Sequence, residues 1–236
     1  MTSKPTYTIM ALPLLFTALI FNSCQSLKTS FGSFNLNQHQ EVMIGTVGHL
    51  EQGVFSQPRF VSFANALGHH RLAVTVKPDS IGFTSSQHLK FYGASAGSKK
   101  ISKQKHQVYI LSVLDKQGLI EMINDNIDLE ALKEMKVVTE IMLKSELISN
   151  EISNAEMLYV QFNPKEKAIQ LVFWSKGKEN SINLNRNDII GYKSLYLCCT
   201  VLKGNPQLKQ LTEYSCSGGT YKTLGFKTKE ENYERL

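Results

Sequence analysis

The feature that most constrains this chain is a hairpin pattern in its second half. Two apolar runs within Glu156–Ser175, "MLYVQF" and "AIQLVFWS", are joined by "NPKEK", a stretch typical of a turn. Apolar and polar residues alternate in Arg71–Pro78, and Gln107–Leu114 is apolar enough for a central strand. Because strands joined by short turns pair antiparallel, the pattern predicts a largely antiparallel sheet.

The middle of the chain departs from this pattern. Asn124–Lys136 contains good helix formers, and Asn126 or Asp128 is expected as its N-cap. Lys144–Glu156 carries an apolar stripe at helical spacing, and Ser145 is expected as its N-cap. The sequence therefore predicts an α+β fold, predominantly antiparallel β with two helices near the middle of the chain. Further strands are expected at Glu41–Val47, His88–Gly93, Val137–Leu143, Ser181–Asp188, Asp188–Leu202 and Gln210–Cys216.

The N-terminus has the pattern of a secretory signal. Lys4 is followed by an apolar run, Ile9–Phe21, that is shorter than the roughly 20 residues needed to cross a bilayer. An ordinary signal-peptidase cut after Ser23 would place Phe21 at −3, where a small residue is preferred. The sequence "FNSC", residues 21–24, instead resembles the lipobox of bacterial lipoproteins, although Phe21 and Asn22 depart from its usual pattern.

This resemblance implies that Cys24 carries the lipid anchor. Residues 1–23 would be removed as a signal peptide, and the Cys24 sulfur would receive a diacylglyceryl group. Gln25 in place of Asp favours the outer membrane, with the body in the periplasm or at the cell surface. The polar stretch that follows predicts a tether over residues 24–40, and residues 41–236 are expected to form a single strand-rich domain. A subdomain break near residue 115 is the alternative.

Three cysteines remain after Cys24. Cys198 and Cys199 are adjacent within an apolar strand, so their side chains are expected on opposite faces. Either Cys199 or Cys198 could bond to Cys216, and closing a loop of about 17 residues would stabilise the fold by about 3 kcal/mol. Three free buried thiols are the alternative.

Positive charge is concentrated in the first part of the mature chain. Residues 25–106 contain nine Lys or Arg against three acids, whereas residues 107–236 are nearly balanced. A basic patch at this location suits anionic lipid headgroups or an anionic cell-wall polymer. The densest run, Gly97–His106, contains no aromatic residue that could stack on bases, so nucleic acid is not expected as a partner. The densest run comprises Lys99, Lys100, Lys103 and Lys105.

Histidine provides the only suggestion of a metal site. All six histidines precede residue 107, but none has the spacing of a common metal motif, so no metal and no cofactor is predicted. His69, His70 and His88 are the weak candidates.

Motifs of catalysis are missing or weak. Two Ser-x-x-Lys matches lie in Lys-rich loops, and neither a Gly-x-Ser-x-Gly elbow nor a phosphate loop occurs. We therefore expect a lipid-anchored envelope protein with a non-catalytic binding or structural role, its partner an envelope protein or an anionic cell-wall polymer. The alternatives are an envelope hydrolase without a readable motif and a histidine-based metal-binding module.

Overall fold

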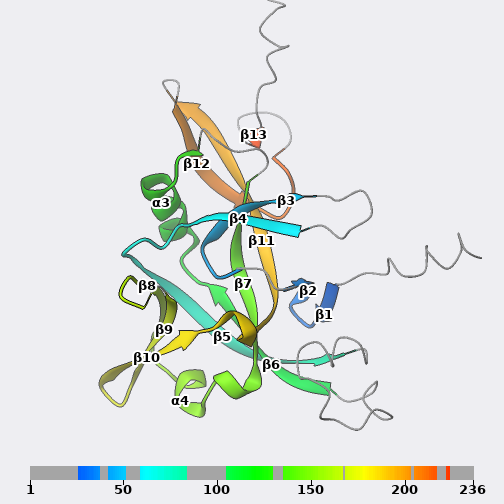
Figure 1. The fold of residues 1–236 in the computed structure, drawn as a ribbon, viewed down its shortest axis with the longest axis vertical. Helices are drawn as coiled ribbons and strands as arrows, with labels where there is room; N and C mark the ends of the chain where they lie inside the picture. Colours follow the sequence, from blue (N-terminus) through cyan, green and yellow to red (C-terminus); the bar gives the residue numbers. More distant parts are fainter. Residues whose placement is uncertain are drawn as a thin grey trace, which may run out of the picture.

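The computed structural model describes residues 26–37, 42–51, 59–83, 105–129, 135–166, 168–202, 205–216 and 222–223 (Figure 1). The strands are β1 (Ser26–Thr29), β2 (Gly32–Leu36), β3 (Thr46–Glu51), β4 (Arg59–Asn65), β5 (Arg71–Gly82), β6 (Lys105–Val113), β7 (Lys136–Lys144), β8 (Leu158–Asn163), β9 (Ala168–Ser175), β10 (Lys178–Leu184), β11 (Ile189–Leu202), β12 (Asn205–Thr212) and β13 (Lys222–Thr223). The helices are α3 (Lys116–Asn126), α4 (Asn150–Ser153) and the 3₁₀ turns η3 (Ser145–Leu147) and η4 (Arg186–Asp188).

The strands of the described residues form one antiparallel sheet in the order β1-β2-β11-β7-β6-β5-β8-β9-β10. β12 and β13 pair with β11, and β3 pairs with both β4 and β7. The body is therefore largely antiparallel β, with two α-helices among the described residues, as the sequence predicts in outline. The expected hairpin is present as β8 and β9, which pair from Leu158 with Phe173 to Asn163 with Ala168.

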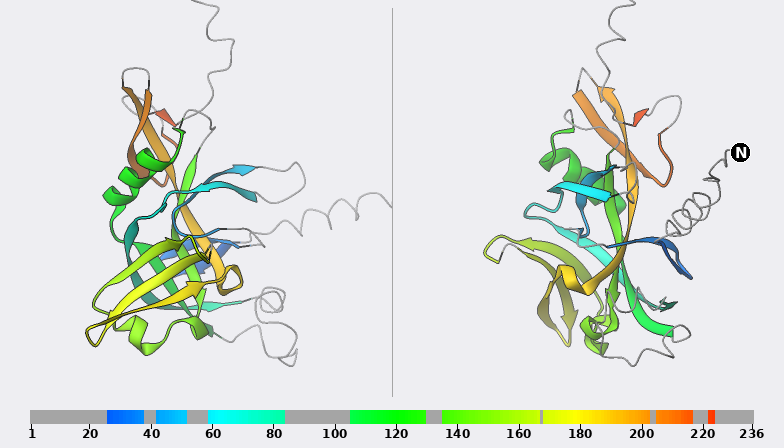
Figure 2. Two further views of the ribbon diagram at one scale, coloured as in Figure 1. Left: turned by 60° about the vertical axis from the view of Figure 1, so that its left-hand side comes forward. Right: turned by 45° about the vertical axis from the view of Figure 1, so that its right-hand side comes forward.

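The central strands bury side chains on both faces of the sheet. On β7, Ile141 and Met142 are both fully buried although neighbours on a strand point in opposite directions. Ile141 belongs to the main core, which also contains apolar residues of α3 and of β8–β10. Met142 belongs to a smaller core on the other face. Figure 2 shows that β1 and β2 cover this second face, opposite the side where β8–β10 lie.

The hairpin of β1 and β2 corrects the expected tether over residues 24–40. Leu27, Phe34 and Leu36 are buried in the smaller core. β2 joins the sheet where Asn35 and Leu36 pair with Tyr192 and Gly191. A Cβ at Gly191 would lie 2.9 Å from the Asn35 carbonyl oxygen, so only glycine permits this close approach. The folded body thus includes β1 and β2, and its first described strand begins at Ser26.

The first helix prediction is wrong in position. α3 ends at Asn126, where the predicted helix was expected to begin, and Ile127 is already extended. The Asp115 side chain caps α3 by accepting from the Gly118 N–H at 2.8 Å. The run "LIEMI" after this cap supplies the buried residues Leu119, Ile120 and Ile123.

The second predicted helix is present only as short pieces. Within Lys144–Glu156 the chain forms η3 and the single turn α4, which Ser149 rather than Ser145 caps. Ser153 donates from its hydroxyl to the Asn150 carbonyl, the kind of local side-chain bond that competes with a longer helix.

Three strand predictions also need correction, and one lies outside the described residues. β3 begins at Thr46 rather than Glu41, because residues 44–45 form a turn with Gly45 at φ +77°. The predicted strand Ser181–Asp188 gives way to η4 at Arg186, and β12 begins at Asn205 rather than Gln210. The strand expected at His88–Gly93 is outside the described residues.

Candidate functional site

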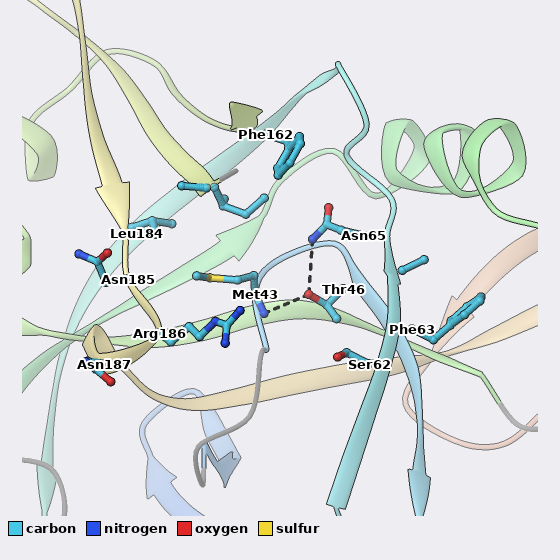
Figure 3. A pocket seen from close by; sticks show the side chains of 13 residues that line it. Met43, Thr46, Ser62, Phe63, Asn65, Phe162, Leu184, Asn185, Arg186 and Asn187 are labelled. Atoms are coloured by element: carbon cyan, nitrogen blue, oxygen red, sulfur yellow. Dashed lines mark hydrogen bonds between the residues drawn. The ribbon is translucent and has the colours of Figure 1, made fainter. Parts of the chain in front are cut away.

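The described residues enclose an open cleft of about 610 Å³ on the same side of the sheet as the main core. Figure 3 shows it between β4 and the ends of β9 and β10, with η4 at its rim. Its lining side chains come from four separate segments of the chain: Met43, Thr46, Ser62, Phe63, Ala64, Asn65, Phe162, Ala168, Ile169, Leu184, Asn185, Arg186 and Asn187. The volume lies within the range of small-ligand and side-chain pockets, roughly 300–1,000 Å³.

An apolar row across three strands makes the floor of the cleft. Ile169 on β9 pairs with Phe162 on β8 and with Leu184 on β10, so the three side chains share one face. Ile169 and Leu184 are buried in the main core, and Phe162 packs against that core. The floor is therefore a fixed part of the fold.

The wall opposite this floor is β4, which is bulged where it lines the cleft. Ala64 pairs with Val47 and Ser62 pairs with Gly48, which leaves Phe63 without an opposite residue. A bulge re-aims the side chain that it carries, and Phe63 is 47% exposed. A Cβ at Gly48 would lie 2.2 Å from the Val61 carbonyl oxygen, so glycine is required there. Among the described strands, β4 pairs with β3 alone, so its other edge has no strand partner there.

Asn65 and Thr46 hold the turn before β3 in place. The Asn65 Nδ2 donates to the Ile44 carbonyl at 3.1 Å, and its Oδ1 accepts from the Leu67 N–H at 3.0 Å. The Thr46 hydroxyl accepts from the Met43 N–H at 3.1 Å and from Asn65 at 3.4 Å (Figure 3). These two polar side chains therefore fix the backbone that forms this side of the cleft, through hydrogen bonds within the protein.

The rim of the cleft is the turn η4. Asn185, Arg186 and Asn187 are all exposed, and the Asn185 side chain makes no capping bond to the turn. Arg186 is the charged residue of the described lining, which contains no Asp, Glu, His or Cys. The arrangement offers an apolar floor, amide groups and one cation, but no acid–base pair for catalysis.

The cysteines lie apart from the cleft. Cys24, the expected lipidation site, is outside the described residues. Cys198 and Cys216 form a disulfide with Cα atoms 5.7 Å apart, one of the two pairings that the sequence leaves open. Cys199 is free and buried in the main core, and burial raises the pKa of its thiol to about 12. A thiol with that pKa is protonated at neutral pH and is not an activated nucleophile.

The predicted basic run is described only at its end. Lys105 begins β6 as an exposed residue opposite Gly82, and Lys99, Lys100 and Lys103 lie outside the described residues. Exposed Lys28 and Lys77 are two further cations, on β1 and β5.

The histidines that the structure describes do not gather. His69 and His70 are exposed in the turn before β5, His49 lies 3.5 Å from Glu51, and His106 packs against Phe83. His88 is outside the described residues. Across the described part of the chain, no three side chains of His, Cys, Asp or Glu come together as a metal site would require.

Sequence reasoning missed the cleft completely. Its lining is spread from Met43 to Asn187, and Asn185–Asn187 falls in a stretch predicted as strand. No signal in the linear sequence marks these residues as neighbours.

None of the helices in the described part of the chain has the length and hydrophobicity to cross a bilayer. No family model, no curated protein and no solved structure matches this chain.

Proposed function

We propose that the protein is a lipid-anchored, non-catalytic binding protein of the bacterial cell envelope, and that its cleft holds an extended segment of a partner protein. The observation that supports binding is the cleft itself: an apolar floor and a polar rim without a carboxylate, imidazole or thiol in the described lining. Hydrolysis of an ester, amide or glycoside needs such groups in reach of one another. The hydroxyls of Ser62 and Thr46 have no base beside them in that lining.

The class of ligand follows from the β4 wall, the apolar floor and the rim of the cleft. The edge of β4 that faces away from β3 can hydrogen-bond to an extended backbone, in the manner of strand addition. Side chains of an extended segment alternate, so every second one would reach the apolar floor of Phe162, Ile169 and Leu184. Arg186 at the rim would favour a carboxylate in the same segment. A glycan would instead require flat aromatic surfaces, and the two rings of the lining lie at separate places in the cleft (Figure 3).

Cross-linking in cells tests the occupant of the cleft. A photoreactive phenylalanine analogue at Phe63 is compared with one at Tyr214, which is 80% exposed and outside the lining. We expect a protease-sensitive adduct at position 63 that position 214 does not give. A glycosidase-sensitive adduct, or equal adducts at both positions, contradicts the proposal.

Charge reversal at the rim gives a second test of the same site. Arg186→Glu is expected to weaken the position-63 adduct severalfold. Lys178→Glu, on the exposed start of β10, is the matched control and should leave the adduct unchanged. An adduct that resists Arg186→Glu would show that the cation does not contribute to recognition.

The anchor needs an experiment of its own. Cells that produce the protein are grown with a labelled fatty acid, and the wild type is compared with Cys24→Ser. We expect label only in the wild type, because the Cys24 thiol is the proposed acceptor. Equal labelling of both forms would refute lipidation at this residue.

A further inference from the structure

The folded body starts very close to the proposed anchor. β1 begins at Ser26, and only Gln25 separates it from Cys24 in the sequence. An extended chain spans at most about 3.6 Å per residue, so the Cα atoms of Cys24 and Ser26 lie within about 7 Å of each other. If Cys24 carries lipid, the surface around β1 must therefore lie at the membrane.

The hairpin of β1 and β2 presents a small polar surface on its outer side. Leu27 and Phe34 point into the smaller core, whereas Lys28, Ser33 and Asn35 are exposed. At the hairpin turn Phe31 is 39% exposed, so part of its ring faces solvent. An aromatic ring beside small polar groups suits the headgroup region of a bilayer.

Two exposed lysines lie at this hairpin. The Lys77 Nζ lies 5.6 Å from the centre of the Phe31 ring, and Lys28 is exposed on β1 itself. Lys105 pairs with Gly82, next to Ile81 of the smaller core, so its side chain lies on the other face of the sheet.

Two acids near the hairpin in the described part of the chain, Asp79 and Glu140, have partners. The Asp79 Oδ2 accepts from the N–H and the hydroxyl of Ser30, each at 3.0 Å. Glu140 lies 3.4 Å from the Lys193 Nζ, and Lys193 also donates to the Phe31 carbonyl. Asp79 keeps its negative charge, and Glu140 is balanced by Lys193, so Lys28 and Lys77 leave the described surface around the hairpin with a net positive charge that complements an anionic lipid surface.

We propose that the outer face of the β1–β2 hairpin is the membrane-contact surface of the protein, with Phe31 at the interface and Lys28 and Lys77 against the phosphates of anionic lipids. This inference rests on the proposed lipid anchor. It also sets the orientation of the body, because the cleft lies on the opposite face of the sheet. In Figure 1 the hairpin is on one side of the central strands and β8–β10, which carry the floor of the cleft, are on the other, so that floor lies on the side of the sheet away from the bilayer.

The test uses the mature lipidated protein in vesicles. A fluorescent maleimide is attached at Ser33→Cys, on the outer face of the hairpin, or at Lys176→Cys, in the β9–β10 turn where the side chain is 84% exposed. Cys199 is buried and Cys198 is bonded to Cys216, so the introduced thiol is the one that reacts. Lipids that carry a spin label should quench the probe at position 33 severalfold more than at position 176. Equal quenching at both positions overturns the proposal.

Lipid composition tests the role of the cations. Quenching at position 33 should increase when phosphatidylglycerol is added to phosphatidylcholine vesicles, and Lys28→Glu with Lys77→Glu should abolish that increase. Lys178→Glu is the control and should retain it. An increase that survives the double change refutes the role of these lysines.

Failure of the anchor is distinguishable from failure of the orientation. Protein that takes up no labelled fatty acid refutes the proposed anchor and with it this inference. Protein that takes up the fatty acid and enters the vesicles, but whose probe at position 33 is quenched no more than the probe at position 176, refutes the membrane-contact surface alone.

Discussion

The two faces of the central sheet are covered in different ways. The main core is closed by α3, by the segment before β3 and by the strands of β8–β10, each of which contributes buried residues. The smaller core is closed by one hairpin that supplies three of its side chains, Leu27, Phe34 and Leu36. A large core buries more apolar surface and should unfold with the whole molecule, whereas the hairpin can open locally at lower cost.

The largest effect is expected from Ile141→Ala, which removes a fully buried side chain at the centre of the main core. Deleting such a side chain costs about 4 kcal/mol in free energy of unfolding because the cavity cannot collapse between β6 and β11. Urea denaturation measures this loss, and hydrogen exchange should accelerate in α3 and in β1–β2 alike. Faster exchange confined to a few residues around position 141 would contradict a cooperative main core.

The Cys198–Cys216 disulfide attaches the segment after β12 covalently, whereas the β1–β2 hairpin is attached to the sheet by non-covalent contacts. Cys198–Cys216 fixes the segment after β12 to β11 across a sequence separation of 18 residues. Removing the bond by Cys216→Ala should cost about 3 kcal/mol, because the unfolded chain regains the entropy of that loop. Urea denaturation with and without reductant checks it. The wild type should lose this stability on reduction and the variant should be insensitive, and a reductant effect of the same size in both would exclude the disulfide as the cause.

The sequence reveals the central strands because their signal is local. β5, β6 and β7 are runs of alternating or continuous apolar residues, and the five consecutive residues "NPKEK" indicate the turn between β8 and β9. The β1–β2 hairpin lacks such a signal. Its sequence is rich in Ser and Asn, and its stability comes from Ile81, Met142 and Ile190, which are distant along the chain. Composition alone therefore predicts a tether where tertiary packing orders a hairpin.

The cleft is hidden from sequence for a related reason. The pairing of Ile169 with Phe162 and Leu184 creates its floor, and each of these residues alone is an ordinary strand residue. The bulge at Phe63 depends on the register between β3 and β4, which a one-sequence pattern does not specify. The helices differ from the prediction because the cap of α3 is Asp115, upstream of the predicted helix, and because the apolar stripe of Lys144–Glu156 does not outweigh the local side-chain bonds of its Ser and Asn residues.

Met142→Ala is the matched partner of Ile141→Ala and should cost less, about 2 kcal/mol. Both side chains are fully buried on β7, but the cavity left by Met142 lies under the hairpin, which can settle into it. Hydrogen exchange should accelerate in β1 and β2 while α3 keeps its protection. Equal loss of protection in α3 would show that the two cores unfold as one unit.

The smallest effect is expected at Asp79, which ties the hairpin turn to β5. Burial opposes ionisation of this carboxyl, but hydrogen bonds from the Ser80 N–H and from Ser30 outweigh it and lower its pKa below the ordinary value of 3.8. A carboxyl with a lowered pKa stabilises the folded state above its unfolded pKa, and this contribution is lost as pH falls through the folded value. The Ser30 amide proton shift, followed by NMR from pH 6 to about 2, should therefore titrate with a midpoint below 3.8. Asp79→Asn should remove that titration and leave the exchange of β1–β2 independent of pH in this range after correction for intrinsic rates. A midpoint at or above 3.8 would mean that Asp79 does not hold the hairpin turn, and that apolar packing alone attaches it.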